Sequence, residues 1–93
     1  MNDANKERIR KFAIDRGFDR VHTCDRLAKA ISIEASELVE CFLWDELCFD
    51  FDHVQEELAD VLIYCQEMLQ YMGWDEDTIV AEKMEKNERK YRA

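Results

Sequence analysis

Apolar residues recur three or four positions apart through most of this 93-residue chain, which is the spacing of one face of an α-helix. The clearest row steps by four, four, three and four, through Leu27, Ile31, Ala35, Leu38 and Phe42. This row predicts a helix that begins with Thr23 or Asp25 as its N-cap and runs to about Trp44.

A helix on each side of this one is predicted from the same spacing. The earlier helix covers 5–16 and stops at Gly17, because glycine is the usual residue just after a helix end. The later helix begins at Asp50 or Asp52 and continues to the second glycine, Gly73. Its apolar stripe consists of Val54, Leu58, Val61, Leu62, Cys65, Leu69 and Met72.

A fourth helix is predicted from Asp75 to about Tyr91. Acidic residues occupy its first turn and lysines and arginines its last turns, which is the charge distribution that the helix macrodipole favours. The chain contains no linker, repeat or low-complexity segment. We therefore expect a single domain over 1–93 with an all-α, four-helix, bundle-like architecture.

Composition adds two expectations about partners. The 22 acidic and 13 basic side chains give a formal net charge of −9, which argues against nucleic acid because a phosphate backbone would be repelled. A lone domain of this length buries only roughly 60 to 65% of the surface that its unfolded chain exposes. Its core is therefore marginal, and we expect several subunits to associate.

The scarcity of glycine and of long apolar runs excludes further classes of protein. Walker loops and dinucleotide fingerprints need several glycines in a short span, and this chain has two glycines far apart. No run approaches the ~18 apolar residues of a membrane span, and the segment 1–11 lacks the apolar region of a signal peptide. We expect a cytoplasmic protein with no membrane partner.

The cysteines show neither a C-x-x-C pair nor a histidine at zinc spacing. They are Cys24, Cys41, Cys48 and Cys65. We interpret them as reduced thiols, with a structural zinc site and a disulfide pair as the less favoured alternatives.

Two pairs of acidic residues lie beside the apolar stripes of the two central helices. Glu34 and Glu37 form one pair, and Glu57 and Asp60 form the other. Charges beside a core are costly without a counter-charge. Carboxylates without His or Cys suit Mg²⁺ or Mn²⁺, and Mg²⁺ commonly shares its coordination shell with substrate phosphates. The pattern favours metal-dependent phosphate chemistry.

A solvated acidic surface is the main alternative for these pairs. Acidic residues are 22 of the 93, so pairs at this spacing also arise by chance. A di-iron bundle is disfavoured because it needs two Glu-x-x-His pairs, and neither His22 nor His53 follows a glutamate by three positions.

The segment 33–44 carries E-x-x-E and then F-L-W, and 56–64 carries E-x-x-D. In this order along the chain, the motifs resemble those of the MazG-like all-α nucleoside triphosphate pyrophosphohydrolases, especially the small branch that includes dCTP pyrophosphatases. The resemblance extends to 12–23, within which 16–22 looks like the aromatic and histidine segment of that family. It also extends to 83–91, which matches the family's ending K-x-x-x-N-x-x-[KR]-Y.

The resemblance implies hydrolysis of a nucleoside triphosphate between the α and β phosphates, to the monophosphate and pyrophosphate, as nucleotide-pool house-cleaning. The catalytic and Mg²⁺-binding positions of the family match Glu34, Glu37, Glu57 and Asp60. Its phosphate-binding positions match Lys83, Asn87, Lys90 and Tyr91. Its nucleoside-binding positions match Phe18, His22, Trp44 and Tyr64.

Core packing is the alternative role for the aromatic residues and His22, and a cationic helix end is the alternative for the C-terminal set. Relatives often have Trp where Phe18 stands, Pro and Asn where Cys24 and Arg26 stand, and Gly where Ile33 or Ser36 stands. These departures bear on the base preference. We expect dCTP or another deoxynucleotide as substrate, with dUTP or a phosphoribosyl-ATP as alternatives.

The third predicted helix carries Ile63 opposite its apolar stripe, so its apolar arc is too wide for one neighbour. The family that the chain resembles commonly forms dimers that pair into tetramers, with adjacent subunits completing each nucleotide pocket. We therefore expect a homotetramer built as a dimer of dimers. A non-catalytic, acidic helical interaction module is the alternative from a different class.

Overall fold

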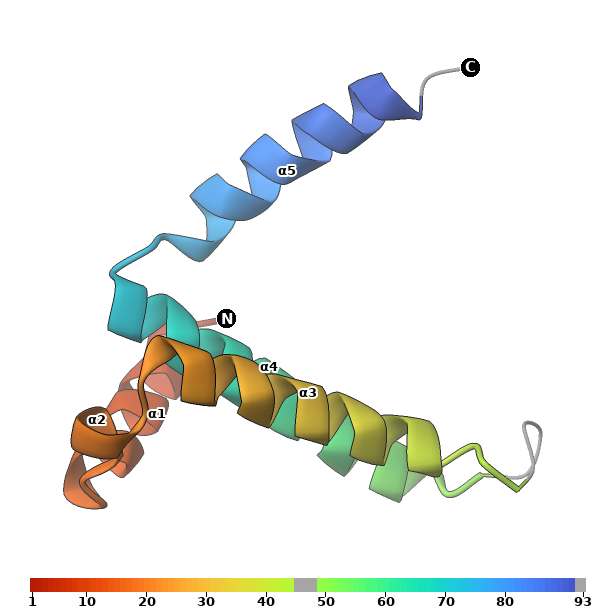
Figure 1. Cartoon of the computed structure of the whole chain (residues 1–93), viewed down its shortest axis with the longest axis horizontal. Coiled ribbons are helices and arrows are strands. Elements are labelled where there is room, and N and C mark those ends of the chain that lie inside the picture. Colours follow the sequence, from red (N-terminus) through yellow and green to blue (C-terminus); the bar gives the residue numbers. More distant parts are fainter. Residues whose placement is uncertain (45–48, 92–93) are drawn as a thin grey trace.

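The computed structural model describes residues 1–44 and 49–91, and every regular element in these ranges is a helix (Figure 1). In chain order the helices are α1 (Asp3–Asp15), α2 (Phe18–Val21), α3 (Cys24–Glu40), α4 (Phe51–Met72) and α5 (Glu76–Lys90). The all-α prediction is confirmed, and the four predicted helices are present. The short α2 is an additional turn that the apolar spacing did not indicate.

The helices α3 and α4 lie side by side as an antiparallel pair, and α1 packs against the C-terminal half of α4 (Figure 1). The side-chain amide of Gln70 in α4 donates to the backbone carbonyl of Lys6 in α1 over 3.0 Å. The helix α5 turns away after Gly73 and extends from the other helices. The single chain is therefore a helical pair with α1 and α2 at one end and α5 projecting from that end.

Capping residues begin and end these helices where local chemistry predicts. The Asp50 carboxylate accepts from the backbone N–H groups of Asp52 and His53 at the start of α4, over 3.0 and 3.3 Å. The Asp75 carboxylate accepts from the N–H of Thr78 over 3.0 Å at the start of α5. Gly73 adopts the left-handed conformation, with φ of 70°, where a side chain would be strained.

The helix α3 ends at Glu40, four residues before the predicted end at Trp44. The backbone there tightens, because the N–H of Phe42 donates to the carbonyl of Val39 and the N–H of Leu43 donates to that of Glu40. Bonds of this three-residue span belong to a 3₁₀-type turn. Leu43 and Trp44 of this turn line a pocket together with Phe49, against which the ring of Phe42 packs.

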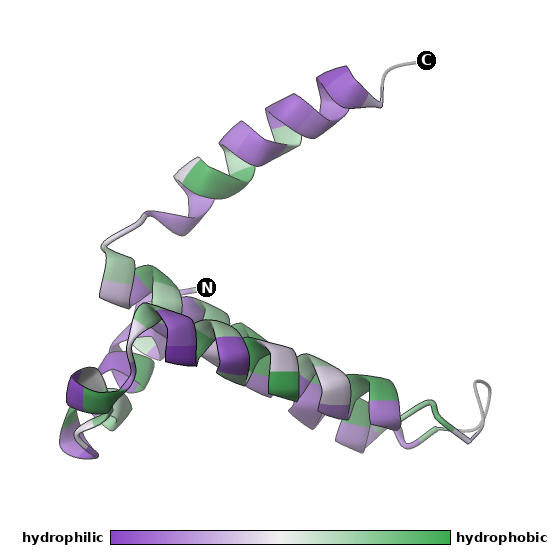
Figure 2. Ribbon diagram, viewed as in Figure 1, coloured by the Kyte–Doolittle hydropathy of each residue, from purple (hydrophilic) through white to green (hydrophobic). Residues whose placement is uncertain are grey.

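The buried core of the single chain is small. Leu27 is 1% exposed, and the other buried residues in the described ranges are Ala13 and Gln66. Leu58 and Leu62 of the predicted α4 stripe are exposed. Figure 2 shows apolar positions recurring along both helices of the pair. In a single chain several of their side chains are exposed, among them Ile33, Val39 and Ile63.

Three cysteines in the described ranges, Cys24, Cys41 and Cys65, are free thiols, and Cys48 lies outside those ranges. None of the described helices combines the length and the apolar character needed to cross a membrane.

Replacement of Leu27 tests where the stability of the chain is concentrated. We expect Leu27→Ala to lower the free energy of unfolding by about 2–5 kcal/mol, because it leaves a cavity that the surrounding helices fill only in part. Leu27→Met keeps the volume and should cost less than about 1.5 kcal/mol. Urea unfolding followed by circular dichroism gives both values. Equal losses in the two variants would contradict this account of the core.

Candidate active site

The two predicted acid pairs face each other because α3 and α4 pack in opposite directions. Carboxylate oxygens of Glu34, Glu37 and Glu57 all lie within 4.8 Å of one another. Asp60 follows Glu57 by about one turn of α4, and its charge contributes to the raised pKa of Glu34. The structure thus brings three of the four predicted acids into one cluster and sets Asp60 beside it.

Burial and like charge make this cluster unfavourable when all of its members are ionised. The pKa of Glu34 rises from 4.5 to about 7, first because of desolvation and then because of a hydrogen bond and charge repulsion from Glu37. Desolvation and Glu37 also raise the pKa of Glu57. The imidazole of His53, whose Nε2 lies 3.2 Å from Oε1 of Glu57, opposes that rise.

Two carboxylate oxygens in the cluster are buried and lack a hydrogen-bond partner within the described part of the chain. They are Oε2 of Glu34 and Oε2 of Glu57. No lysine or arginine of residues 1–44 and 49–91 forms an ion pair with any of the four acids. Buried polar atoms in native proteins generally have a hydrogen-bond partner or a bound ligand, so we expect these two oxygens to bind one.

The donor set fits a hard divalent cation. Its atoms are all carboxylate oxygens, the ligands that Mg²⁺ and Mn²⁺ prefer. Burial and the charge of Glu57 raise the pKa of the nearby Cys41 thiol, so in the metal-free chain this thiol is protonated at neutral pH. That thiol donates to the backbone carbonyl of Glu37, with Sγ 3.6 Å from the oxygen.

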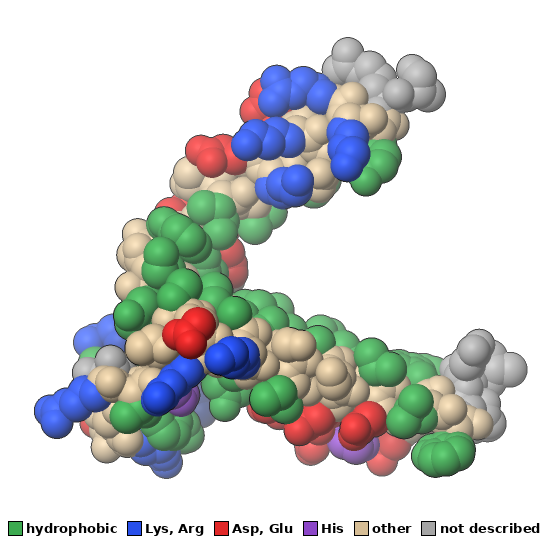
Figure 3. Space-filling model, viewed as in Figure 1, with side chains coloured by type: hydrophobic (Ala, Val, Ile, Leu, Met, Phe, Trp, Pro, Cys, Tyr) green, Lys and Arg blue, Asp and Glu red, His purple; other side chains and the backbone are tan. Residues whose placement is uncertain are grey.

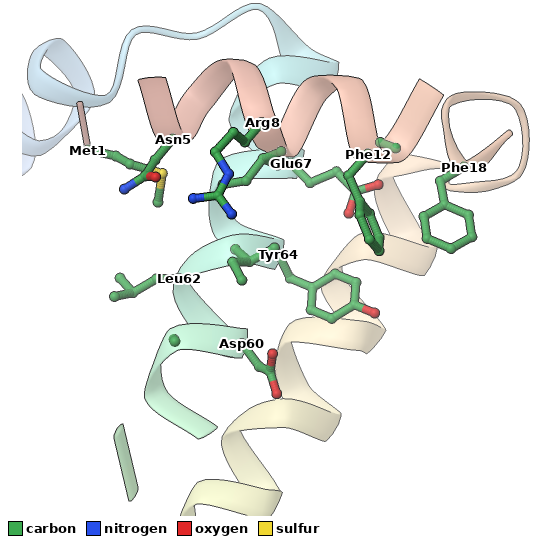
Figure 4. Close-up of a pocket in the computed structure, with 13 residues that line it drawn as sticks. Met1, Asn5, Arg8, Phe12, Phe18, Asp60, Leu62, Tyr64 and Glu67 are labelled. Atoms are coloured by element: carbon green, nitrogen blue, oxygen red, sulfur yellow. The ribbon is translucent and has the colours of Figure 1, made fainter. Parts of the chain in front are cut away.

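A pocket of about 630 Å³ adjoins the acids, between α4 on one side and α1 and α2 on the other. Asp60 and Tyr64 line it from α4, as Figure 4 shows, with Phe12 and Phe18 on the opposite side. Burial and the surrounding acids raise the pKa of Tyr64, so its hydroxyl remains a hydrogen-bond donor at neutral pH. Because Asp60 lies beside the acidic cluster and also lines the pocket, the pocket opens next to the cluster.

His22 does not line this pocket itself, but its ring lies against Phe18 and near Tyr64, which do. Its ring stacks on Phe18 with a centroid distance of 4.5 Å, and its centroid lies 6.4 Å from that of Tyr64. Its Nδ1 lies 2.7 Å from Oε1 of Glu67. Three of the four residues predicted to surround a nucleoside are therefore together.

Trp44 lies apart from those three residues in the single chain. It is 95% exposed and lines a second pocket, of about 530 Å³, with Phe49 and His53 among its neighbours. The separation follows from the fold, because residues 22 and 44 flank opposite ends of α3.

The four residues predicted to bind phosphate are all at the C-terminal half of α5 or just after it, and that helix points away from the acids (Figure 3). Asn87 is partly buried, and Nζ of Lys90 lies 5.3 Å from the ring centroid of Tyr91. Lys83 precedes Asn87 by four positions, so the two share one face of the helix. A single chain does not bring these residues to the carboxylate cluster.

The sequence reasoning missed two side chains that contact the predicted residues. His53 precedes Glu57 by four positions on α4, and that helical spacing was a local signal for the contact. Glu67 is 45 positions from His22, so no local pattern indicated their pairing.

Comparison with known proteins gives a family match and a similar solved structure. The model of the MazG-like family matches residues 29–93, a range that contains all four acids and α5. No curated protein matches the sequence significantly. The crystal structure of a pyrophosphatase from Archaeoglobus fulgidus DSM 4304 is similar, with a TM-score of 0.81 and 38% sequence identity over 94% of this chain and 88% of that chain.

The family match extends over more than half of the chain, and the structural likeness extends further, over the segment that holds α1 and α2. Both agree with the resemblance that the motifs carried. The chain therefore belongs to the MazG-like family of all-α nucleoside triphosphate pyrophosphatases.

Proposed function

We propose that this chain is a Mg²⁺-dependent pyrophosphohydrolase that cleaves a deoxynucleoside triphosphate, with dCTP preferred, between the α and β phosphates. The products are the monophosphate and pyrophosphate, and the role is house-cleaning of the cytoplasmic nucleotide pool. The observation that carries the proposal is the cluster of Glu34, Glu37 and Glu57 within 4.8 Å, beside an aromatic pocket.

Glu34, Glu37, Glu57 and Asp60 would hold the cation, and Mn²⁺ would be accepted at the same oxygens. Bound there, Mg²⁺ would supply positive charge to the phosphate oxygens and to the attacking water. The two unpartnered oxygens, Oε2 of Glu34 and Oε2 of Glu57, are the support for this assignment in the chain itself.

The carboxylates would also move the proton of the attacking water. A general base works best when its pKa is near the working pH. The pKa of about 7 belongs to Glu34 in the metal-free chain, and a bound cation would lower it, so the general base would be a carboxylate of the cluster with an oxygen that the cation leaves free. Phe18, His22 and Tyr64 would surround the base in the adjoining pocket, where aromatic faces can stack on it.

Assembly would complete the site. The phosphate chain of the substrate needs donors such as Lys83, Asn87, Lys90 and Tyr91, and in a single chain these residues project away from the acids on α5. The lysines and arginines of α5 complement the acids along the α3–α4 pair (Figure 3). A homotetramer, built as a dimer of dimers, would bring α5 and Trp44 of neighbouring copies to each pocket and cover the exposed apolar surface.

Substitution of the acids tests the proposed chemistry. With Mg²⁺, the wild-type chain should convert dCTP to dCMP and pyrophosphate. Glu37→Gln or Asp60→Asn should lower kcat by at least roughly 100-fold, since each removes a cation ligand. Circular dichroism should show an intact and even more stable fold, because the substitution relieves charge repulsion.

Glu82→Gln removes one charge from an exposed position on α5 and serves as the control, with wild-type turnover expected. Orthophosphate as the first product would place the cleavage at another bond and contradict the proposal. Full activity in both acid variants would favour the non-catalytic interaction module.

Metal affinity should rise with pH. The pKa of Glu34 is raised from 4.5 to about 7, so at a pH below about 7 a cation must displace a proton from Glu34 to bind. In the metal-free chain, a carboxyl group with a raised pKa contributes stability at pH below about 4.5, and this contribution is lost as the pH rises through about 7.

Thermal melting with EDTA or with Mg²⁺ across this pH range measures both effects. The metal-free melting temperature should fall as pH rises, and the increase produced by Mg²⁺ should grow. Glu34→Gln should flatten the metal-free curve. A stabilisation by Mg²⁺ that does not change with pH would contradict the assignment of Glu34.

The proposed assembly predicts the mass of the protein in solution. Multi-angle light scattering should give about four times the 11.1 kDa of one chain. Truncation after residue 82 removes the basic half of α5. It should abolish turnover and weaken Mg²⁺ binding much less. A monomer that retains full activity at nanomolar concentration would overturn both the tetramer and the shared pocket.

A further inference from the structure

Glu67, which pairs with His22 beside the pocket, has no role in the function proposed above. Nδ1 of His22 lies 2.7 Å from Oε1 of Glu67, and the two side chains are 23% and 12% exposed. His22 is the residue just after α2, whereas Glu67 lies in the second half of α4. Glu67 itself lines the pocket, as Figure 4 shows.

This contact determines which nitrogen of the ring carries a proton. An ionised carboxylate can only accept hydrogen bonds, so Nδ1 must donate to it. The neutral imidazole then carries its lone pair on Nε2, and Nε2 has no hydrogen-bond partner among the residues that the structure describes. The carboxylate of Glu67 therefore makes Nε2 an acceptor.

A second contact limits the rotation of the ring. The face of His22 stacks on Phe18, with an interplanar angle of 24°. Anchored at Nδ1 and stacked on one face, the ring keeps a defined orientation beside Phe18 and Tyr64, both of which line the pocket. A base held against these aromatic residues would meet an acceptor on the imidazole edge.

We propose that Glu67 is a positioning residue that selects the base through His22. It holds His22 in the Nδ1-protonated form, so that Nε2 accepts a hydrogen bond from the exocyclic amine of the substrate base. Cytosine carries an amine at the position where uracil carries a carbonyl oxygen, which cannot donate. The pair thus favours dCTP over dUTP, and this inference rests on the proposed pyrophosphohydrolase function.

The tautomer of His22 can be measured without substrate. Nitrogen-15 NMR of the full chain at alkaline pH, where an imidazole is ordinarily neutral, distinguishes a protonated ring nitrogen from an unprotonated one. His53→Gln removes the signals of the other histidine and so assigns those of His22. We expect a protonated Nδ1 and an unprotonated Nε2 in the wild type, and a redistributed proton in Glu67→Leu. A wild-type ring protonated at Nε2 overturns the inference.

Selection of the base is measured as the ratio of kcat/KM for dCTP to that for dUTP. Glu67→Leu should lower this ratio roughly 10-fold, mainly through a higher KM for dCTP, because one hydrogen bond usually contributes about that factor to affinity. Glu67→Gln should restore part of the ratio, because its amide oxygen can still accept from Nδ1. The control Glu82→Gln should leave the ratio unchanged.

A double substitution separates action through His22 from direct contact of Glu67 with the base. If Glu67 acts through His22, the ratio in Glu67→Leu combined with His22→Leu should equal that in His22→Leu alone. Multiplied losses, or a ratio that Glu67→Leu does not change, overturn the inference and leave the proposed function intact. Absence of hydrolysis of every nucleoside triphosphate overturns the proposed function and this inference with it.

Discussion

Because α3 and α4 pack antiparallel, the carboxylates of Glu34, Glu37 and Glu57 meet at an interface that apolar side chains would otherwise fill. Desolvation and repulsion there oppose ionisation, and the raised pKa values of Glu34 and Glu57 are the result. A proton or a cation must therefore accompany the cluster. The same packing that contributes most of the contact between helices also creates the demand for a positive charge.

The small core of the single chain has a related origin. A helix that presents acids on one side and a wide apolar arc on the other cannot bury both against one partner. In α4 the acids face α3, while Leu58, Leu62 and Ile63 stay exposed in the single chain. The helix α5 has exposed apolar side chains as well, at Ile79, Val80 and Met84. The fold of one chain is thus complete as a framework for the acids and incomplete as a hydrophobic core.

Local interactions explain which parts of this structure the sequence predicts. The helix ends at Asp50, Asp75 and Gly73 depend on contacts within a few residues, and all were expected. The acid cluster could be predicted from the sequence, because helical spacing sets each pair and a short connection sets the two helices side by side. The pairing of His22 with Glu67 depends on tertiary packing, and the direction of α5 depends on the turn that begins at Gly73; neither leaves a periodic signal.

The helix α4 also sets the distance between the acid cluster and the pocket wall. Glu57, Asp60, Tyr64 and Glu67 follow one another at intervals of three, four and three residues, from the acid cluster to the pocket wall. A rise of about 1.5 Å per residue puts the first and the last about 15 Å apart along a rigid axis. On the proposed function, a substrate that reaches from the acid cluster to the pocket wall must span a distance of this order. Selection would then act on the extent of a nucleotide as well as on its charge and base, and a shortened product would lose its hold on one end.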